Sequence, residues 1–179
     1  MPFIKNLESS FNACCLIFAA NNNCMNQTLF TQIHSLLRWG VVLFGLWAVI
    51  NALIGVISKR NYGLSDNRSS LLFMIFCDIQ LLIGLLLYFN GAWFDMLKTN
   101  AGAVMKDSYN RFFAMEHAVM MIIAWLLIHI GRSLVKKTDS NTQKHKRSLL
   151  YFGIAFIIIL AMIPWPIREI VARPWFPKF

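Results

Sequence analysis

The chain has 179 residues, of which 58% are hydrophobic and 14% are charged. Soluble domains are typically about 45–50% apolar, so this composition excludes an ordinary soluble protein and indicates one compact domain in a membrane. The formal net charge of +9 could suit nucleic acid. However, the basic residues lie between apolar runs, as they do in loops beside anionic lipid, and no nucleic-acid partner is expected.

The first 26 residues differ from the rest of the chain. They contain one short apolar run, Phe11 to Ala20, and lack the A-x-A pattern of a signal-peptide cleavage site. We therefore expect residues 1–26 to form a poorly ordered N-terminal extension. Residues 27–179 are expected to form the transmembrane domain.

Four apolar runs follow, and a bilayer-crossing helix takes about 20 such residues. We expect spanning helices at about residues 32–57, 70–89, 112–131 and 149–163. The predicted fold is all-α, an integral membrane up-down four-helix bundle. The last helix should end at Pro164-Trp165-Pro166, because proline cannot continue the hydrogen-bond ladder. The amphiphilic tail beyond it is expected to be an interfacial anchor.

The first helix carries polar residues at one end and small residues along the same face. At 100° per residue, this face holds His34, Arg38, Val41, Gly45, Ala48, Ala52 and Gly55. Small side chains allow either another helix or a flat ligand to approach the backbone closely. Both interpretations are open for Gly45.

The second helix has two polar residues near its middle. Asp78 and Gln80 are about 200° apart around the helix, so they cannot face the same neighbour. One of them is expected to hydrogen-bond to another helix. A proton-relay role for Asp78 is an alternative, because an ionisable residue inside a membrane marks function by default.

The connections between helices differ in charge. Lys59 and Arg60 lie in the first, and residues 132–147 form a strongly basic third connection that includes His145, which we expect to be a solvated loop residue. The second connection, residues 90–111, is polar and mixed in charge. The positive-inside rule then predicts a multi-pass membrane protein with both termini outside.

The third helix carries ionisable groups that a spanning helix tolerates only when they are paired, wetted or ligating. Glu116 and His117 are adjacent near its start, and His129 lies near its far end. The first and third helices run in the same direction and should stand diagonally opposite in an up-down bundle. His34 and Arg38 then share a layer near the outer boundary with Glu116 and His117.

Two interpretations of this layer are open. In the first, His34 and His117 are axial ligands of one b-type haem, Gly45 makes room for the ring, and Arg38, Arg111 or Arg168 meets the propionates. In the second, Arg38 and Glu116 form a buried ion pair around which the histidines hydrogen-bond. That network would fix the bundle or bind a quinone head group.

A second bis-histidine haem is not expected. His129 lies twelve residues after His117, which is about 120° around and about 18 Å along the helix. The chain also lacks a C-x-x-C-H motif, so any haem would be held noncovalently.

Several short motifs resemble one small bacterial family of four-helix inner-membrane proteins, commonly labelled cytochrome b or cytochrome b-like. The resemblance covers roughly residues 27–176 and implies haem binding, electron transfer and a location in the inner (cytoplasmic) membrane. The chain departs from the two-haem membrane cytochromes, whose pattern needs two pairs of histidines. The motifs are HSLLRW (34–39), QLLIGLLLYF (80–89), EH (116–117), KHKR (144–147) and IPWP (163–166).

Other functions are less well supported. The chain has no zinc-spaced His/Cys cluster, nucleophile elbow or phosphate loop, so no autonomous catalytic activity is expected. The main alternative to a haem protein is a cofactor-free membrane subunit or assembly factor of a respiratory complex. The expected partners are the lipid bilayer and either a respiratory-chain complex or quinone.

Overall fold

The structure is a computed structural model that describes residues 2–176, with side chains described from residue 27 onward. Every regular element in this part of the chain is helical. The elements are α1 (Pro2–Ser58), α2 (Leu64–Asn90), α3 (Ala92–Lys106), α4 (Ser108–Arg111), the π-helix η1 (Phe112–Glu116), α5 (His117–Lys136) and α6 (Asn141–Met162).

Within the described residues, four helical segments are long and apolar enough to cross a membrane: 27–58, 64–90, 108–136 and 141–162. The predicted all-α four-helix fold is confirmed. Each observed helix except the last extends further than predicted at both ends, because polar residues continue the helices past their apolar centres. α6 ends at Met162, just before Pro164, as the sequence predicts.

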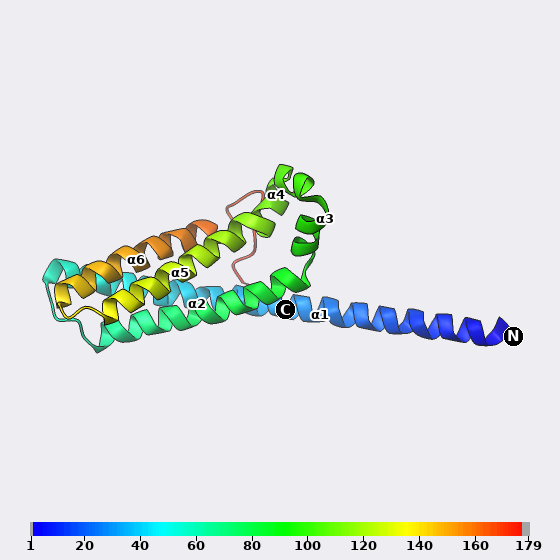
Figure 1. The fold of residues 1–179 in the computed structure, drawn as a ribbon, viewed down its shortest axis with the longest axis horizontal. Helices are drawn as coiled ribbons and strands as arrows, with labels where there is room; N and C mark the ends of the chain where they lie inside the picture. Colours follow the sequence, from blue (N-terminus) through cyan, green and yellow to red (C-terminus); the bar gives the residue numbers. More distant parts are fainter. Residues whose placement is uncertain (1, 177–179) are drawn as a thin grey trace.

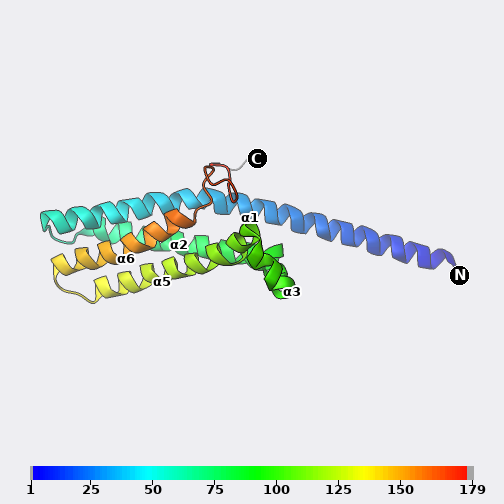
Figure 2. The same ribbon diagram turned by 90° about the horizontal axis from the view of Figure 1, so that it is seen from above.

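The four long helices form an antiparallel bundle (Figures 1 and 2). α1 packs against α2 and α6, and α5 packs against the same two helices. α1 and α5 therefore run in the same direction and lie diagonally opposite, as predicted. The seam between α2 and α5 is the least closely packed of the four.

The bundle core is made of large rings set against small residues. Phe73 and Phe152 are almost completely buried, as is Ile128. A Cβ atom added to Gly45 would lie 2.7 Å from the ring of Phe156 and 2.8 Å from that of Phe73. The small residue at Gly45 therefore serves helix packing, and the prediction that it makes room for a flat ligand is not supported.

The N-terminal part of α1 extends beyond the other helices as a single helix (Figure 1). The backbone of residues 2–26 continues α1. That residues 1–26 form a poorly ordered N-terminal extension stays a prediction. The side chains of residues 1–26 lie outside the described residues.

The second connection is not the loop that its polarity suggested. It contains α3 and α4, and α3 bends at Asn100, where φ is −150° and ψ is 66°. The third connection is also shorter than predicted, because α5 continues to Lys136 and α6 begins at Asn141. Most of the basic residues of this region therefore lie on helix ends.

The orientation of the bundle can be tested with reporter fusions. Fusions after Asp139 are expected to report the cytoplasm, and fusions after Gly102 the exterior, because the basic connections favour the cytoplasmic side. The measurement is paired alkaline phosphatase and fluorescent-protein activity at each position. The reverse pattern would contradict the predicted orientation, with both termini then inside.

Candidate functional site

Two histidines meet across the diagonal of the bundle. His34 on α1 and His117 at the start of α5 have ring centroids 6.5 Å apart, with ring planes inclined at 69°. Since α1 and α5 are not direct neighbours along the bundle, these side chains bridge the space between them. The predicted juxtaposition of the two histidines is present.

The orientation of the His117 ring is set by a carbonyl group. Nδ1 of His117 lies 2.9 Å from the main-chain oxygen of Met162, at the end of α6. A carbonyl oxygen only accepts hydrogen bonds, so Nδ1 carries the proton and donates it. The lone pair of the neutral ring is therefore on Nε2. The rings of Phe112 and Phe113 lie against His117 on its own helix.

A π turn immediately precedes His117. The backbone N–H of His117 donates to the carbonyl oxygen of Phe112, five residues earlier. The carbonyl of Ala114 accepts a 2.8 Å hydrogen bond from the Tyr88 hydroxyl of α2. π turns are single-residue insertions that frequently occur at functional sites. The sequence analysis assumed a regular helix here.

The position of His34 depends on α2. The Gln80 amide nitrogen donates to the main-chain oxygen of His34 at 2.9 Å. Gly84 lets the ring lie on the α2 backbone, since a Cβ there would be 3.2 Å from Cε1 of His34. Nδ1 of His34 is buried and has no hydrogen-bond partner within the described part of the chain. An unpaired buried nitrogen of this kind calls for an explanation.

The predicted ion pair between Arg38 and Glu116 is not formed among the described residues. Arg38 is 8% exposed and donates to the carbonyl oxygens of Trp175 at 2.8 Å and Pro174 at 3.3 Å. Glu116 instead accepts from Nε of Arg111 at 2.7 Å, in a partly exposed pair. The prediction was wrong because the C-terminal segment, whose path the sequence does not reveal, occupies the position next to Arg38.

That C-terminal segment packs through aromatic rings on the part of α1 that carries Arg38. Trp39 stacks on Trp175 and Phe176, with centroids 6.0 and 5.6 Å away, and contacts Trp165 edge-on at 6.2 Å. Trp175 and Phe176 remain 47% and 63% exposed. The tail thus combines contact with the bundle and an exposed aromatic surface, and its role as an interfacial anchor stays a prediction.

Arg168 reaches the layer of the histidines indirectly. Its guanidinium carbon lies 4.8 Å from the centroid of the Phe112 ring, and the same ring lies 5.8 Å from that of His117. Its Nη1 also donates to the carbonyl oxygen of Ala161 at 3.0 Å. Arg168 therefore places a positive charge one ring away from His117.

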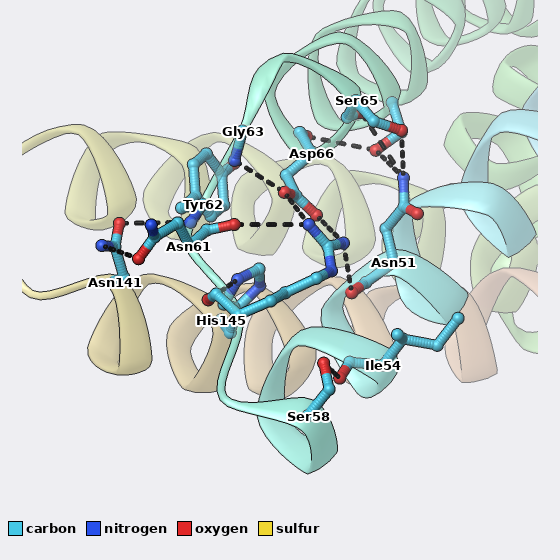
Figure 3. Close-up of polar contacts among 12 residues, drawn as sticks. Asn51, Ile54, Ser58, Asn61, Tyr62, Gly63, Ser65, Asp66, Asn141 and His145 are labelled. Atoms are coloured by element: carbon cyan, nitrogen blue, oxygen red, sulfur yellow. Dashed lines mark hydrogen bonds and ion pairs between the residues drawn. The ribbon is translucent and has the colours of Figure 1, made fainter.

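A polar network at the other end of the bundle was not predicted (Figure 3). Asp66 is 3% exposed, and its carboxylate accepts from both terminal nitrogens of Arg60, at 2.6 and 2.7 Å, and from the Gly63 N–H at 2.9 Å. The hydrogen bonds to Asp66 are the main reason that the pKa of Arg60 is raised. Arg60 also donates to the carbonyl oxygen of Asn51. This network joins the ends of α1 and α2.

His145 belongs to the same network and is not a solvated loop residue. It lies on α6, is 0% exposed, and its Nε2 is 3.2 Å from the carbonyl oxygen of Arg60. Its ring packs directly on Gly55 of α1. The signal that could have revealed this is helical spacing, since all but one of the buried residues of α6 recur every three or four positions, at His145, Ser148, Phe152, Ala155 and Ile159.

Asp78 and Gln80 face different helices, as predicted. Gln80 contacts α1, whereas Oδ1 of Asp78 accepts from the Trp125 indole of α5 at 2.6 Å. The same Oδ1 lies 3.3 Å from Nε2 of His129. His129 is therefore engaged with Asp78 and stands apart from the His34–His117 pair.

Within the described residues, no group of three or more His, Cys, Asp or Glu side chains converges to hold a metal ion. The histidine pair alone supplies two ligands, which suits a metal whose other ligands come from a macrocycle. Comparisons with family models, with curated proteins and with solved structures found no match. The resemblance to cytochrome b-like proteins therefore stays a prediction from the sequence.

Proposed function

We propose that this protein is a membrane electron carrier in which His34 and His117 hold one b-type haem between α1 and α5. The observation that carries the proposal is the facing of these two rings, with centroids 6.5 Å apart, across the diagonal of the bundle. Metal–imidazole bonds are about 2.0–2.1 Å, so two rings on one metal have centroids about 6 Å apart.

The surroundings of the two rings support ligation. Ligating histidines usually donate their other ring N–H to a carbonyl or carboxylate, which fixes the ring. His117 makes this bond to Met162, which leaves Nε2 free to ligate. Nδ1 of His34 is buried and has no hydrogen-bond partner within the described part of the chain. A bond from Nδ1 to the metal would account for this nitrogen, and it requires the His34 ring to turn so that Nδ1 points at the metal. With the His34 ring turned in this way, the two histidines would supply both imidazole ligands of one haem.

The charged residues divide into two groups in this proposal. Arg168, which lies over Phe112, is the best placed to meet a propionate by a charge-assisted hydrogen bond. Arg38 is already engaged with two carbonyl groups, and Glu116 with Arg111, so these two are assigned to shaping the outer end of the site. When bound, haem would supply one-electron chemistry that these side chains do not have.

The test is a reduced-minus-oxidised spectrum of protein produced with haem supplied. The wild type is expected to show a low-spin b-type spectrum after dithionite reduction, and His34→Ala and His117→Ala are each expected to lose it. His129→Ala is the matched control, because it removes a histidine from the same helix that does not face His34. It is expected to keep the spectrum.

A colourless wild-type protein would contradict the haem proposal. The same would follow if both single variants kept the low-spin band. The histidine pair would then be a structural contact, and the supported alternative would be a cofactor-free membrane subunit or assembly factor of a respiratory complex. Circular dichroism of each variant shows whether the helices remain, so that loss of haem is separated from loss of fold.

A further inference from the structure

A buried arginine near the end of α5 has no acidic partner. Arg132 is 6% exposed, and no Asp or Glu side chain in the described part of the chain lies within ion-pair distance of it. A buried charge is costly unless an opposite charge compensates it. An anion from outside the protein would supply that compensation.

The guanidinium group of Arg132 is anchored to α2 through one terminal nitrogen. Nη1 donates to Oγ of Ser70 at 2.6 Å and to the carbonyl oxygen of Asn67 at 3.3 Å. The edge formed by Nε and Nη2 is less occupied. Among the described residues, Nε has no hydrogen-bond partner, and Nη2 contacts only Oδ1 of Asn67, at 3.2 Å.

This edge has the geometry of an anion-binding fork. Nε and Nη2 of an arginine present two parallel N–H groups, which bind two oxygens of one carboxylate or phosphate group. The side chain in contact with this edge belongs to Asn67, which is exposed at the start of α2. It is a neutral acceptor, so an anion that displaces it gains a charge-assisted bond that the amide does not provide.

Arg132 lies at the depth of the lipid head groups. The spanning segment 108–136 has 29 residues, which is about 43 Å at about 1.5 Å per residue. The hydrocarbon core of a bilayer is only about 30 Å thick, so each end of the segment extends about 6 Å beyond it. Arg132 is four residues before the last residue of α5, which is also about 6 Å. The phosphate groups of the lipids are therefore at its level.

Two exposed basic residues lie beside Arg132. Lys136 is one turn further along α5 and about 40° around the helix, so it is on the same face. Arg68 directly follows Asn67 on α2. Neither forms an ion pair within the described residues. A zwitterionic head group carries an ammonium group that these charges repel, so a head group with net negative charge is favoured.

The α2–α5 seam offers a surface for the rest of a lipid molecule. It is the least closely packed seam of the bundle. Leu64 and Ile75 are exposed apolar residues of α2 that lie within about 80° of Asn67 around the helix, so they border the same seam. An acyl chain can pack on these side chains, whereas a free phosphate ion cannot use them.

We propose that Arg132, Lys136 and Arg68 bind the phosphate group of an anionic phospholipid at the end of the α2–α5 seam. Two phosphate oxygens accept from Nε and Nη2 of Arg132 in place of the Asn67 side chain. The positive-inside rule predicts that this end of the bundle faces the cytoplasm, where anionic lipids attract basic residues. The site lies at the other end of α5 from His117 and does not depend on haem being bound.

The experiment is native mass spectrometry of the full chain in detergent, titrated with dioleoylphosphatidylglycerol or dioleoylphosphatidylcholine. Wild type is expected to bind the first phosphatidylglycerol about tenfold more tightly than the first phosphatidylcholine, because hydrogen bonds between charged groups are the stronger kind. Arg132→Gln should lower the affinity for phosphatidylglycerol about tenfold, and Lys136→Gln severalfold. Arg132→Lys keeps the charge without the two-donor edge and should fall between wild type and Arg132→Gln.

Lys137→Gln is the matched control. It removes the same charge from the next residue, which lies about 140° around α5 from Arg132 and away from the seam, and it should leave the affinity nearly unchanged. Circular dichroism checks that the helices remain. If Arg132→Gln loses its helices, the comparison of Lys136→Gln with Lys137→Gln decides, because both residues are exposed.

Three results would overturn the proposal. Equal affinity for the two lipids would show that net head-group charge is not recognised. Equal losses in Lys136→Gln and Lys137→Gln would show that the basic end of the bundle attracts anionic lipid without a defined site. Displacement of phosphatidylglycerol by an equal concentration of inorganic phosphate would show that the ligand is free phosphate and that the seam contributes nothing.

Discussion

Replacing Gly55 with alanine is expected to lower the free energy of unfolding by about 2 kcal/mol or more. A Cβ atom at this position would overlap the ring of His145, which is completely buried and cannot move toward solvent. Overpacking of a filled core costs about 1–3 kcal/mol and occasionally more, while alanine regains about 1 kcal/mol of helix propensity. The overlap places Gly55 at the upper end of this range. Reversible unfolding in mixed micelles gives the value.

Gly153 provides a matched control for this substitution. It is also a helical glycine, but an added Cβ would have no other atom within 4 Å. Gly153→Ala is therefore expected to be neutral or to stabilise the protein by up to about 1 kcal/mol. The variant that combines Gly55→Ala with His145→Ala should lose less stability than the sum of the two single variants. Additive losses would show that the ring is not what opposes the new methyl group.

Replacing Asp66 with alanine is expected to cost about 2–4 kcal/mol. The carboxylate is buried, and its loss leaves Arg60 and the Gly63 N–H without their main acceptor. Removing one partner of a buried ion pair costs about 3–5 kcal/mol. The Arg60 side chain is 33% exposed, so water partly compensates its charge and the expected loss is smaller.

The ion pair between Arg111 and Glu116 tests whether burial explains the loss of stability expected for Asp66→Ala. Nε of Arg111 lies 2.7 Å from Oε1 of Glu116, and Nη2 of Arg60 lies 2.6 Å from Oδ1 of Asp66. The side chains of Arg111 and Glu116, however, are 37% and 42% exposed. Exposed pairs contribute about 0–1 kcal/mol, so Glu116→Ala should change the unfolding free energy by no more than about 1 kcal/mol. Equal losses for the two variants would show that burial of Asp66 does not determine the effect.

The fold was predictable because bilayer-spanning runs are marked by length and hydropathy alone. The proline pair around Trp165 correctly ended the last helix. Polar sequence was a poorer guide, because residues 92–106 and 108–111 are helical although they were expected to be a loop. A helix continues through polar residues when one of its faces packs against the rest of the protein. His145 lies in a basic segment and is nevertheless a core residue.

The candidate site was predictable only where depth and helix direction determine contact. His34 and His117 meet because parallel diagonal helices carry them at the same level. The partner of Arg38 could not be predicted, since it is a main-chain carbonyl of the C-terminal segment and no side-chain pattern marks it. The contact between Asp78 and His129 depends on the relative rotation of α2 and α5, which composition does not specify.

The π turn before His117 has a consequence for how this chain can change in length. A π turn accommodates one extra residue, and deleting Phe113, Ala114 or Met115 would restore α-helical hydrogen bonding there. Because the π turn absorbs the extra residue as a local bulge, the helix segments on its two sides would keep nearly the same rotation after such a deletion. The span would remain apolar and long enough for the bilayer, and Phe112 would stay on the side of the helix that faces His117. Homologous chains that retain the histidine pair are therefore expected to tolerate a difference of one residue in this segment.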